Sequence, residues 1–135
     1  MKLKIQLLFV TIGLFIMACA PSKQDENLNF PEKLLGVEMR YTYSGGNQYA
    51  VKFEKEGLSY QYRTGAAPEK WWGSFKYNHM MTDNNEHFVS WFEPGYGDYV
   101  TLLVNFDSNV IYGSAIIKGK IIHFQRATIQ SVKKP

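Results

Sequence analysis

Three side chains in this sequence are of types that bind polar ligands or transfer protons. Tyr41 and Tyr43 stand two residues apart in the segment R-Y-T-Y, and Glu93 lies in S-W-F-E-P-G-Y-G at residues 90–97. Residues two apart on a β-strand point to the same face. The two tyrosine hydroxyls can therefore converge on one ligand atom, and Glu93 shares a face with Trp91. A carboxylate inside an apolar interior needs either a partner or a function.

Structural roles for the same residues stay open at this point. Tyrosines on a half-buried strand pack well and find hydrogen-bond partners without any ligand. Glu93 can equally be a buried carboxylate that pairs with Lys70, Arg63 or a tyrosine. The residue types alone do not separate these roles from ligand binding.

Short β-strands are the elements expected to position these side chains. Apolar residues recur with period two between clusters of Gly, Asn and Asp, which is typical of strands joined by hairpins. No stretch between Leu34 and Val132 has helical periodicity of useful length. The pattern predicts strands over 36–43, 48–54, 58–64, 71–77, 87–93, 99–106, 110–117 and 121–132, with a short segment over 79–81.

Eight or nine such strands favour a single antiparallel up-and-down β-barrel of the calycin (lipocalin-like) type over residues 34–135. Closure of the sheet removes its exposed edges. A barrel of about eight strands can hold one small ligand. The fold expected from the sequence therefore includes an internal cavity.

The first 18 residues are expected to be an export signal rather than part of the fold. Lys2 and Lys4 precede an apolar run that is shorter than the roughly 20 residues of a membrane-spanning helix. The run ends in I-M-A-C, which resembles a bacterial lipobox and predicts lipid attachment at Cys19. Residues 19–33 then form a flexible tether, and the protein is expected on the cell envelope. Because Ala20 rather than aspartate follows the cysteine, the outer membrane is favoured.

Charge and residue types exclude several classes of function. Of the 15 basic residues, Lys2 and Lys4 belong to the signal, which leaves a net charge of +1 against 12 acidic residues. That balance argues against nucleic-acid binding. Cys19 is the only cysteine, and the three histidines lie on different predicted strands with no close pair, so no metal site is expected. The sequence leaves open whether the barrel forms a homodimer.

The motifs together resemble a known family. The segment L-G-V-E-M-R-Y-T-Y-S-G-G-N-Q-Y at 35–49, Y-R at 62–63, Trp71, S-W-F-E-P-G-Y-G at 90–97 and Y-G at 112–113 are similar to those of the phenolic acid decarboxylases and the related MoaF-like proteins. The resemblance covers about residues 35–129 and implies a calycin-type barrel with a central cavity. In the decarboxylases, it implies, two tyrosines and an arginine orient a hydroxycinnamate and a glutamate transfers a proton, without a cofactor.

Carried over to this chain, the tyrosine pair corresponds to Tyr41 and Tyr43, and the glutamate corresponds to Glu93. The arginine is missing, because Lys70 precedes Trp71 where the family has an arginine. A lysine lacks the planar two-pronged donor of arginine.

Three hypotheses follow. The first is a lipid-anchored barrel that binds a small aromatic or acidic molecule through six side chains: Tyr41, Tyr43, Arg63, Lys70, Trp91 and Glu93. The second is a cofactor-free decarboxylase of hydroxycinnamic acids, with Glu93, Tyr41 and Tyr43 as catalytic residues. The third is a structural or interaction lipoprotein whose barrel is filled with side chains.

Overall fold

The computed structural model describes residues 34–135, and these residues are organised as β-strands. The signal segment, Cys19 and the tether lie outside the described residues. The strands are β1 (Glu38–Tyr43), β2 (Gln48–Glu54), β3 (Gly57–Tyr62), β4 (Trp72–Phe75), β5 (Tyr77–Met81), β6 (His87–Glu93), β7 (Asp98–Asn105), β8 (Val110–Ile117) and β9 (Ile121–Lys133). The all-β prediction is confirmed. In the part of the chain described, no helix is long and apolar enough to cross a membrane.

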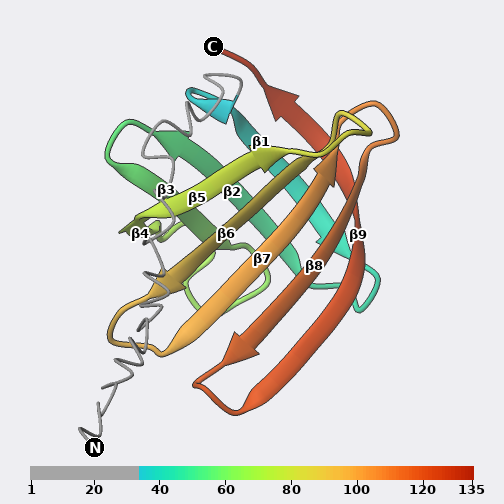
Figure 1. Cartoon of the computed structure of the whole chain (residues 1–135). Coiled ribbons are helices and arrows are strands. Elements are labelled where there is room, and N and C mark those ends of the chain that lie inside the picture. Colours follow the sequence, from blue (N-terminus) through green and yellow to red (C-terminus); the bar gives the residue numbers. More distant parts are fainter. Residues whose placement is uncertain (1–33) are drawn as a thin grey trace, which may run out of the picture.

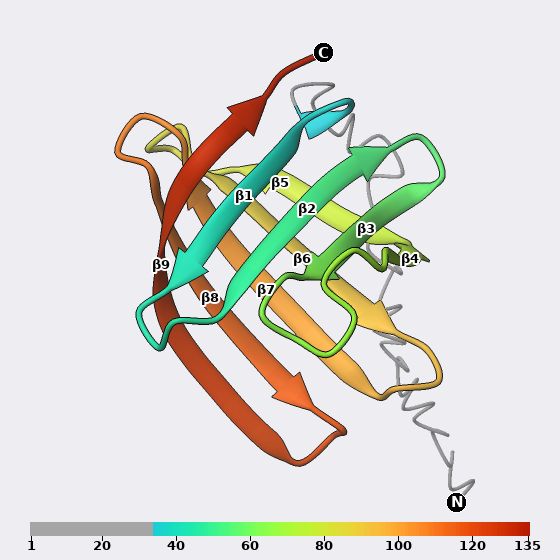
Figure 2. The same ribbon diagram turned by 180° about the vertical axis from the view of Figure 1, so that it is seen from behind.

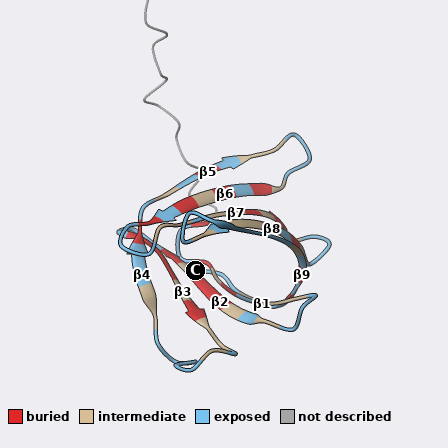
Figure 3. Cartoon of the chain, turned by 90° about the horizontal axis from the view of Figure 1, so that it is seen from below, coloured by how far each residue is buried: buried red, intermediate tan, exposed pale blue. Residues whose placement is uncertain are grey.

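The strands form one antiparallel sheet that curves into a nearly closed barrel, seen from opposite sides in Figures 1 and 2. Their order in the sheet is β4-β3-β2-β1-β9-β8-β7-β6-β5, so that chain neighbours pair and β1 also pairs with β9. Viewed along its axis, the barrel is a ring of strands (Figure 3). The predicted up-and-down barrel is therefore confirmed.

The two edge strands of the sheet are β4 and β5, and no hydrogen bonds pair them with each other. The gap between them is the seam of the barrel. Only Lys76 separates the two strands in the chain. A hairpin needs a connection of at least about two residues, so β4 and β5 cannot pair as a hairpin. This corner corrects one predicted boundary: the strand expected over 71–77 ends at Phe75, and Tyr77 begins the next strand.

Alternation along the strands separates the interior of the barrel from its surface. On β6, Val89, Trp91 and Glu93 are 0%, 4% and 2% exposed, whereas Phe88 and Phe92 are 41% and 50% exposed. The period of two is the geometric consequence of an extended backbone. It places Trp91 and Glu93 side by side in the interior, as their spacing predicts.

The end of the barrel opposite the β1–β2 and β6–β7 turns holds most of the apolar core. Its fully buried side chains include Leu34, Met39, Phe53, Leu58 and Ile111. Each such side chain contributes roughly 1.5–3 kcal/mol through removal from water. This packed end stabilises the fold, and it leaves the other end free to carry polar groups.

Two histidines at the packed end form a close pair, which the sequence analysis did not expect. His79 Nε2 lies 3.0 Å from His87 Nδ1, and the two rings are stacked with centroids 5.1 Å apart. The expectation of no close histidine pair is wrong because β5 and β6 are a hairpin, in which His87 pairs with Met81, the inward neighbour of His79. Burial and the neighbouring His87 lower the pKa of His79 to about 4, so the neutral ring is the form that is stable there.

Candidate ligand cavity

The end of the barrel near the β1–β2 and β6–β7 turns contains a cavity of about 470 Å³. Its wall is mainly aromatic, and it includes eight aromatic side chains: Tyr41, Tyr43, Tyr49, Tyr60, Tyr62, Tyr96, Trp72 and Trp91. Polar groups in the same wall include Asn47, Glu93, Asp98, His123 and Gln125. Small-molecule sites in proteins commonly combine such an apolar wall with a few polar groups.

The predicted tyrosine pair lies in this wall. Tyr41 and Tyr43 both project inward from β1, with ring centroids 5.4 Å apart in an edge-to-face arrangement. Tyr49 on β2 stacks against Tyr41 at 5.8 Å and against Tyr62 of β3 at 5.0 Å. Burial is the largest cause that raises the pKa of Tyr41 well above its ordinary value, and the neighbouring tyrosines raise it further. Burial likewise is the largest cause that raises the pKa of Tyr49 to about 12. These hydroxyls therefore stay protonated and can donate hydrogen bonds.

Gly113 on β8 makes room for Tyr43. A Cβ atom at this position would lie 2.3 Å from the hydroxyl oxygen of Tyr43, closer than atoms approach in folded proteins. The absence of a side chain lets the hydroxyl end of Tyr43 approach the backbone of β8. The glycine of the Y-G motif at 112–113 is therefore needed to accommodate Tyr43 in the cavity wall.

Glu93 lies in the cavity wall with a hydrogen bond to each carboxylate oxygen. Trp91 Nε1 donates to Oε1 at 2.9 Å, and the Tyr60 hydroxyl donates to Oε2 at 3.0 Å. Burial raises the pKa of the Glu93 carboxyl, the two hydrogen bonds act in the opposite direction, and nearby Asp98 raises it again. The hydrogen-bond partners of Glu93 are therefore Tyr60 and Trp91. Neither Lys70 nor Arg63 bonds to it.

Asp98 faces Glu93 across the β6–β7 pair, because the two residues are in register. Its Oδ1 accepts a hydrogen bond from the backbone N–H of Lys118 at 2.7 Å. The two carboxylates lie on one wall of the cavity. Together they give this wall an excess of negative charge and of hydrogen-bond acceptors.

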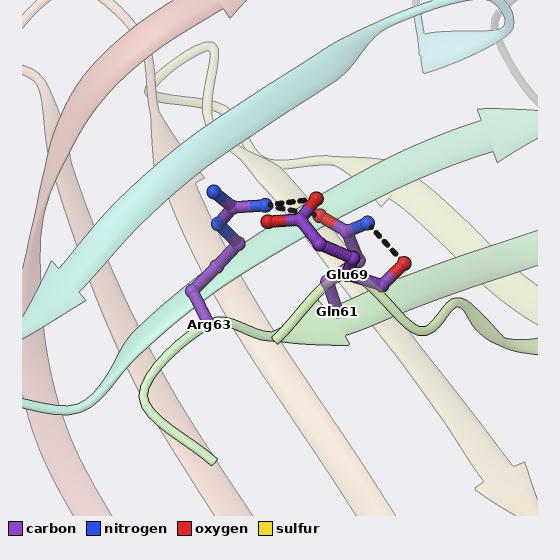
Figure 4. A network of polar contacts seen from close by, with 3 residues as sticks. All are labelled: Gln61, Arg63 and Glu69. Atoms are coloured by element: carbon purple, nitrogen blue, oxygen red, sulfur yellow. Dashed lines mark hydrogen bonds and ion pairs between the residues drawn. The ribbon is translucent and has the colours of Figure 1, made fainter. Parts of the chain in front are cut away.

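Arg63, a predicted ligand-binding residue, is not in the cavity wall. Its guanidinium donates to Gln61 Oε1 at 3.0 Å and to Glu69 Oε2 at 3.1 Å, and Gln61 Nε2 donates to the backbone carbonyl of Glu69 at 2.9 Å (Figure 4). Gln61 points away from Tyr60 and Tyr62, which line the cavity from the same strand. The arginine therefore holds the β3–β4 loop against the outside of the barrel.

Lys70, the residue at the family's arginine position, is exposed and also lies outside the cavity wall. Its ammonium stands over the ring of Trp72, 3.6 Å from the centroid. Of the six predicted binding residues, the structure thus brings together Tyr41, Tyr43, Trp91 and Glu93. Ligand binding by these four stays a prediction.

Several cavity residues were not singled out from the sequence. Tyr49, Tyr60 and Tyr62 alternate with the outward residues of β2 and β3, so the period of two contained the signal for them. Trp72 was missed in favour of Trp71, whose ring instead lies under Lys52 on the outside of the barrel at 4.7 Å. Tyr96, in the β6–β7 turn, contacts Trp72 at 5.8 Å, and nothing in the local sequence pattern marks that contact.

The contact of Tyr43 with Gly113 can be tested by a double-mutant cycle. Gly113→Ala should lower the free energy of unfolding by about 1–3 kcal/mol, because the added methyl group overlaps Tyr43. In a Tyr43→Phe background, the same substitution should cost less, since the nearest overlapping atom is gone. Denaturant unfolding of the four proteins measures both costs. Equal costs in the two backgrounds would show that the contact does not limit this position.

The environment of Glu93 predicts a pH dependence of stability. Because the pKa of Glu93 is raised from its ordinary 4.5, the folded protein retains this proton at a pH where the unfolded chain has lost it. The resulting stabilisation is present below pH 4.5 and is lost as the pH rises through the raised value. The free energy of unfolding of the wild type, relative to Glu93→Gln, should therefore fall with rising pH.

Urea unfolding at several pH values between 4 and 8 measures this difference. Glu56→Gln, which removes an exposed carboxylate from the β2–β3 turn, is the matched control and should leave the profile of the wild type unchanged. A constant difference between wild type and Glu93→Gln across the range would contradict the environment described for Glu93.

Comparisons with known proteins bear on the fold and on the family. Among solved structures, 16 chains match. One is a crystal structure from Burkholderia vietnamiensis, provisionally assigned as a beta-lactamase, with a TM-score of 0.62 and 13% sequence identity. The match covers 72% of this chain and 93% of that one. At this identity, the similarity shows a shared fold and nothing about activity. A search of curated proteins finds no match.

The family comparison is more specific. The model of the phenolic acid decarboxylase family matches residues 31–134, which include every strand of the barrel and all the cavity residues described above. The barrel, the inward tyrosine pair and the buried glutamate agree with the resemblance seen in the motifs. This chain belongs to the phenolic acid decarboxylase family.

Proposed function

We propose that the protein is a lipid-anchored binding barrel whose cavity takes a small aromatic molecule. One observation carries this proposal: the end of the barrel away from the core holds a cavity of about 470 Å³ with eight aromatic side chains in its wall. This volume lies within the usual range of about 300–1,000 Å³ for small-molecule sites. A barrel filled with side chains, the structural alternative, would not retain such a space.

The chemistry of the wall favours a flat ring that bears a hydroxyl group. Aromatic rings pack against one another edge-to-face or offset, and a ligand ring can join the Tyr41, Tyr43 and Tyr49 cluster in the same way. The protonated tyrosine hydroxyls supply donors, and Glu93 supplies acceptors. A phenol can use both kinds of group.

Decarboxylation of a hydroxycinnamic acid is the second candidate, and the position of Glu93 favours it. The carboxyl group is buried in the cavity wall with a raised pKa, as a general acid requires. In this reaction Glu93 would protonate the alkene carbon that bears the carboxylate. The phenol hydroxyl would release its proton to solvent as the ring becomes a quinone methide. When carbon dioxide leaves, the electrons of the broken carbon–carbon bond would form the vinyl double bond, the ring would become an aromatic phenolate, and the phenolate and Glu93 would each regain a proton from solvent. Membership of the family supports this candidate.

The two candidates are separated by measuring ligand binding and turnover of hydroxycinnamic acids on the same protein. The purified protein should bind 4-ethylphenol with quenching of tryptophan fluorescence, because Trp72 and Trp91 line the cavity. Tyr41→Phe should weaken binding roughly 3- to 10-fold, the effect of one lost hydrogen bond. Tyr112→Phe, which removes a hydroxyl that is exposed on the outside of β8, is the matched control and should have no effect.

The same protein should be incubated with p-coumaric and ferulic acids and assayed for vinylphenols by chromatography. Absence of product, with wild type indistinguishable from Glu93→Gln, supports binding as the function. Vinylphenol formation that is abolished in Glu93→Gln would instead establish the decarboxylase. No binding of 4-ethylphenol and no turnover would exclude both candidates.

The membrane anchor in the proposal comes from the sequence around Cys19, which lies outside the described residues. When the full chain is expressed in a Gram-negative host, it should be found in the outer-membrane fraction and should incorporate labelled palmitate. Cys19→Ser should abolish the label, whereas Ala20→Ser, next to the lipidation site, should retain it. Labelling that is independent of Cys19 would overturn this part of the proposal.

A further inference from the structure

We propose that the ligand carries a positive charge, so that the cavity takes an aromatic amine or another organic cation rather than an aromatic acid. This inference rests on the proposed binding function and specifies the class of its ligand. It departs from the anionic substrates that the family resemblance implies. The reason is the placement of Glu93, Asp98, Arg63 and Lys70 relative to the cavity wall.

The cavity wall contains no lysine or arginine among residues 34–135. The two cationic side chains expected at the site are directed elsewhere: the Arg63 guanidinium bonds to Gln61 and Glu69 on the outside of the barrel, and the Lys70 ammonium lies over the ring of Trp72. A ligand carboxylate would therefore lose its hydration without gaining a lysine or arginine partner in the wall. Burial of an unpaired charge is strongly unfavourable.

Negative charge, in contrast, is built into the wall. Glu93 and Asp98 face each other in register on β6 and β7, and both line the cavity. Asp98 uses only Oδ1 for a bond within the barrel, to the backbone N–H of Lys118, and its other oxygen has no hydrogen-bond partner among the described residues. That oxygen is available to a ligand ammonium group.

The rings of the wall add a second attraction for a cation. The faces of tyrosine and tryptophan rings attract a cation within about 6 Å of the centroid, and the attraction grows when the cation is removed from water. The cavity wall offers several such rings: Tyr41, Tyr43, Tyr49, Tyr60 and Tyr62. One face of Trp72 already holds the Lys70 ammonium, so the charged end of the ligand is expected on the side of Asp98 and Glu93.

Tyrosine hydroxyls alone do not decide the sign of the charge, because they can donate to an anion or accept from an ammonium group. Asp98 decides it. Its carboxylate repels an anion and attracts a cation, whereas Glu93 adds acceptor oxygens and no positive charge to the same wall. A neutral phenol would bind with intermediate affinity, through ring packing and hydrogen bonds.

Three probes of nearly the same shape test the sign of the charge. Tyramine is cationic, 4-ethylphenol is neutral, and 3-(4-hydroxyphenyl)propionate is anionic at pH 7. Titration of the purified full-length protein at low ionic strength should show the order tyramine, then 4-ethylphenol, then the propionate, with tyramine about 10-fold tighter than 4-ethylphenol. Raising the salt concentration should reduce the advantage of tyramine.

Asp98→Asn isolates the contribution of the free carboxylate oxygen, because asparagine keeps an acceptor for the Lys118 N–H. It should weaken tyramine binding about 3- to 10-fold and leave 4-ethylphenol binding unchanged. Asp107→Asn removes one negative charge from the exposed turn at the other end of the barrel and should change neither affinity. Thermal unfolding of both variants checks that the barrel is intact.

The outcomes separate this inference from the function on which it rests. If 4-ethylphenol binds but the propionate binds as tightly as tyramine or more tightly, the cationic class is overturned while the binding barrel stands. If tyramine binds most tightly but its affinity is the same in Asp98→Asn and Glu93→Gln as in the wild type, the assignment to these carboxylates is overturned. If none of the three probes binds, the proposed function fails with it.

Discussion

The burial of one carboxylate constrains the whole cavity end of this barrel. Glu93 is 2% exposed, and an unpartnered carboxylate at that depth would cost more than the barrel gains from any single apolar side chain. Trp91 from the same strand and Tyr60 from the far side of the barrel each donate a hydrogen bond to it. The contact with Tyr60 joins β3 to β6, which do not pair in the sheet. Glu93 therefore requires that the barrel be curved and nearly closed.

Closure, in turn, depends on pairing between the first and last strands. β9 runs along β1 in antiparallel register and carries the sheet across from the β5–β8 half to the β2–β4 half. The seam falls between β4 and β5, where a single-residue connection leaves no room for a hairpin. Tyrosines from β1, β2 and β3 can then face carboxylates from β6 and β7 across one space. The tyrosines of β1, β2 and β3 and the carboxylates of β6 and β7 therefore come from different halves of the sheet.

The sequence predicted the fold well because the period of two is a local property that any half-buried strand must show. The same rule placed Tyr41, Tyr43, Trp91 and Glu93 correctly in the interior, and it also separated Arg63 from Tyr60 and Tyr62 on β3. Arg63 was nevertheless expected to bind the ligand, as a possible cationic partner for Glu93 or for an acidic molecule. Trp72 and Tyr96 could not be predicted, because their positions depend on a corner and a turn that bring distant segments together. The His79–His87 pair was missed for a similar reason, since it depends on the register of the β5–β6 hairpin.

The division of the barrel into a packed end and a hollow end has an evolutionary consequence. The side chains that hold the fold together lie in one half, where Leu34, Phe53 and Leu58 are almost completely buried. The residues of the cavity wall lie in the other half, where Lys70 stands at the position for which the family resemblance implies an arginine and lies outside the wall. Natural selection can therefore alter what this scaffold recognises while the stability of the scaffold is inherited almost unchanged.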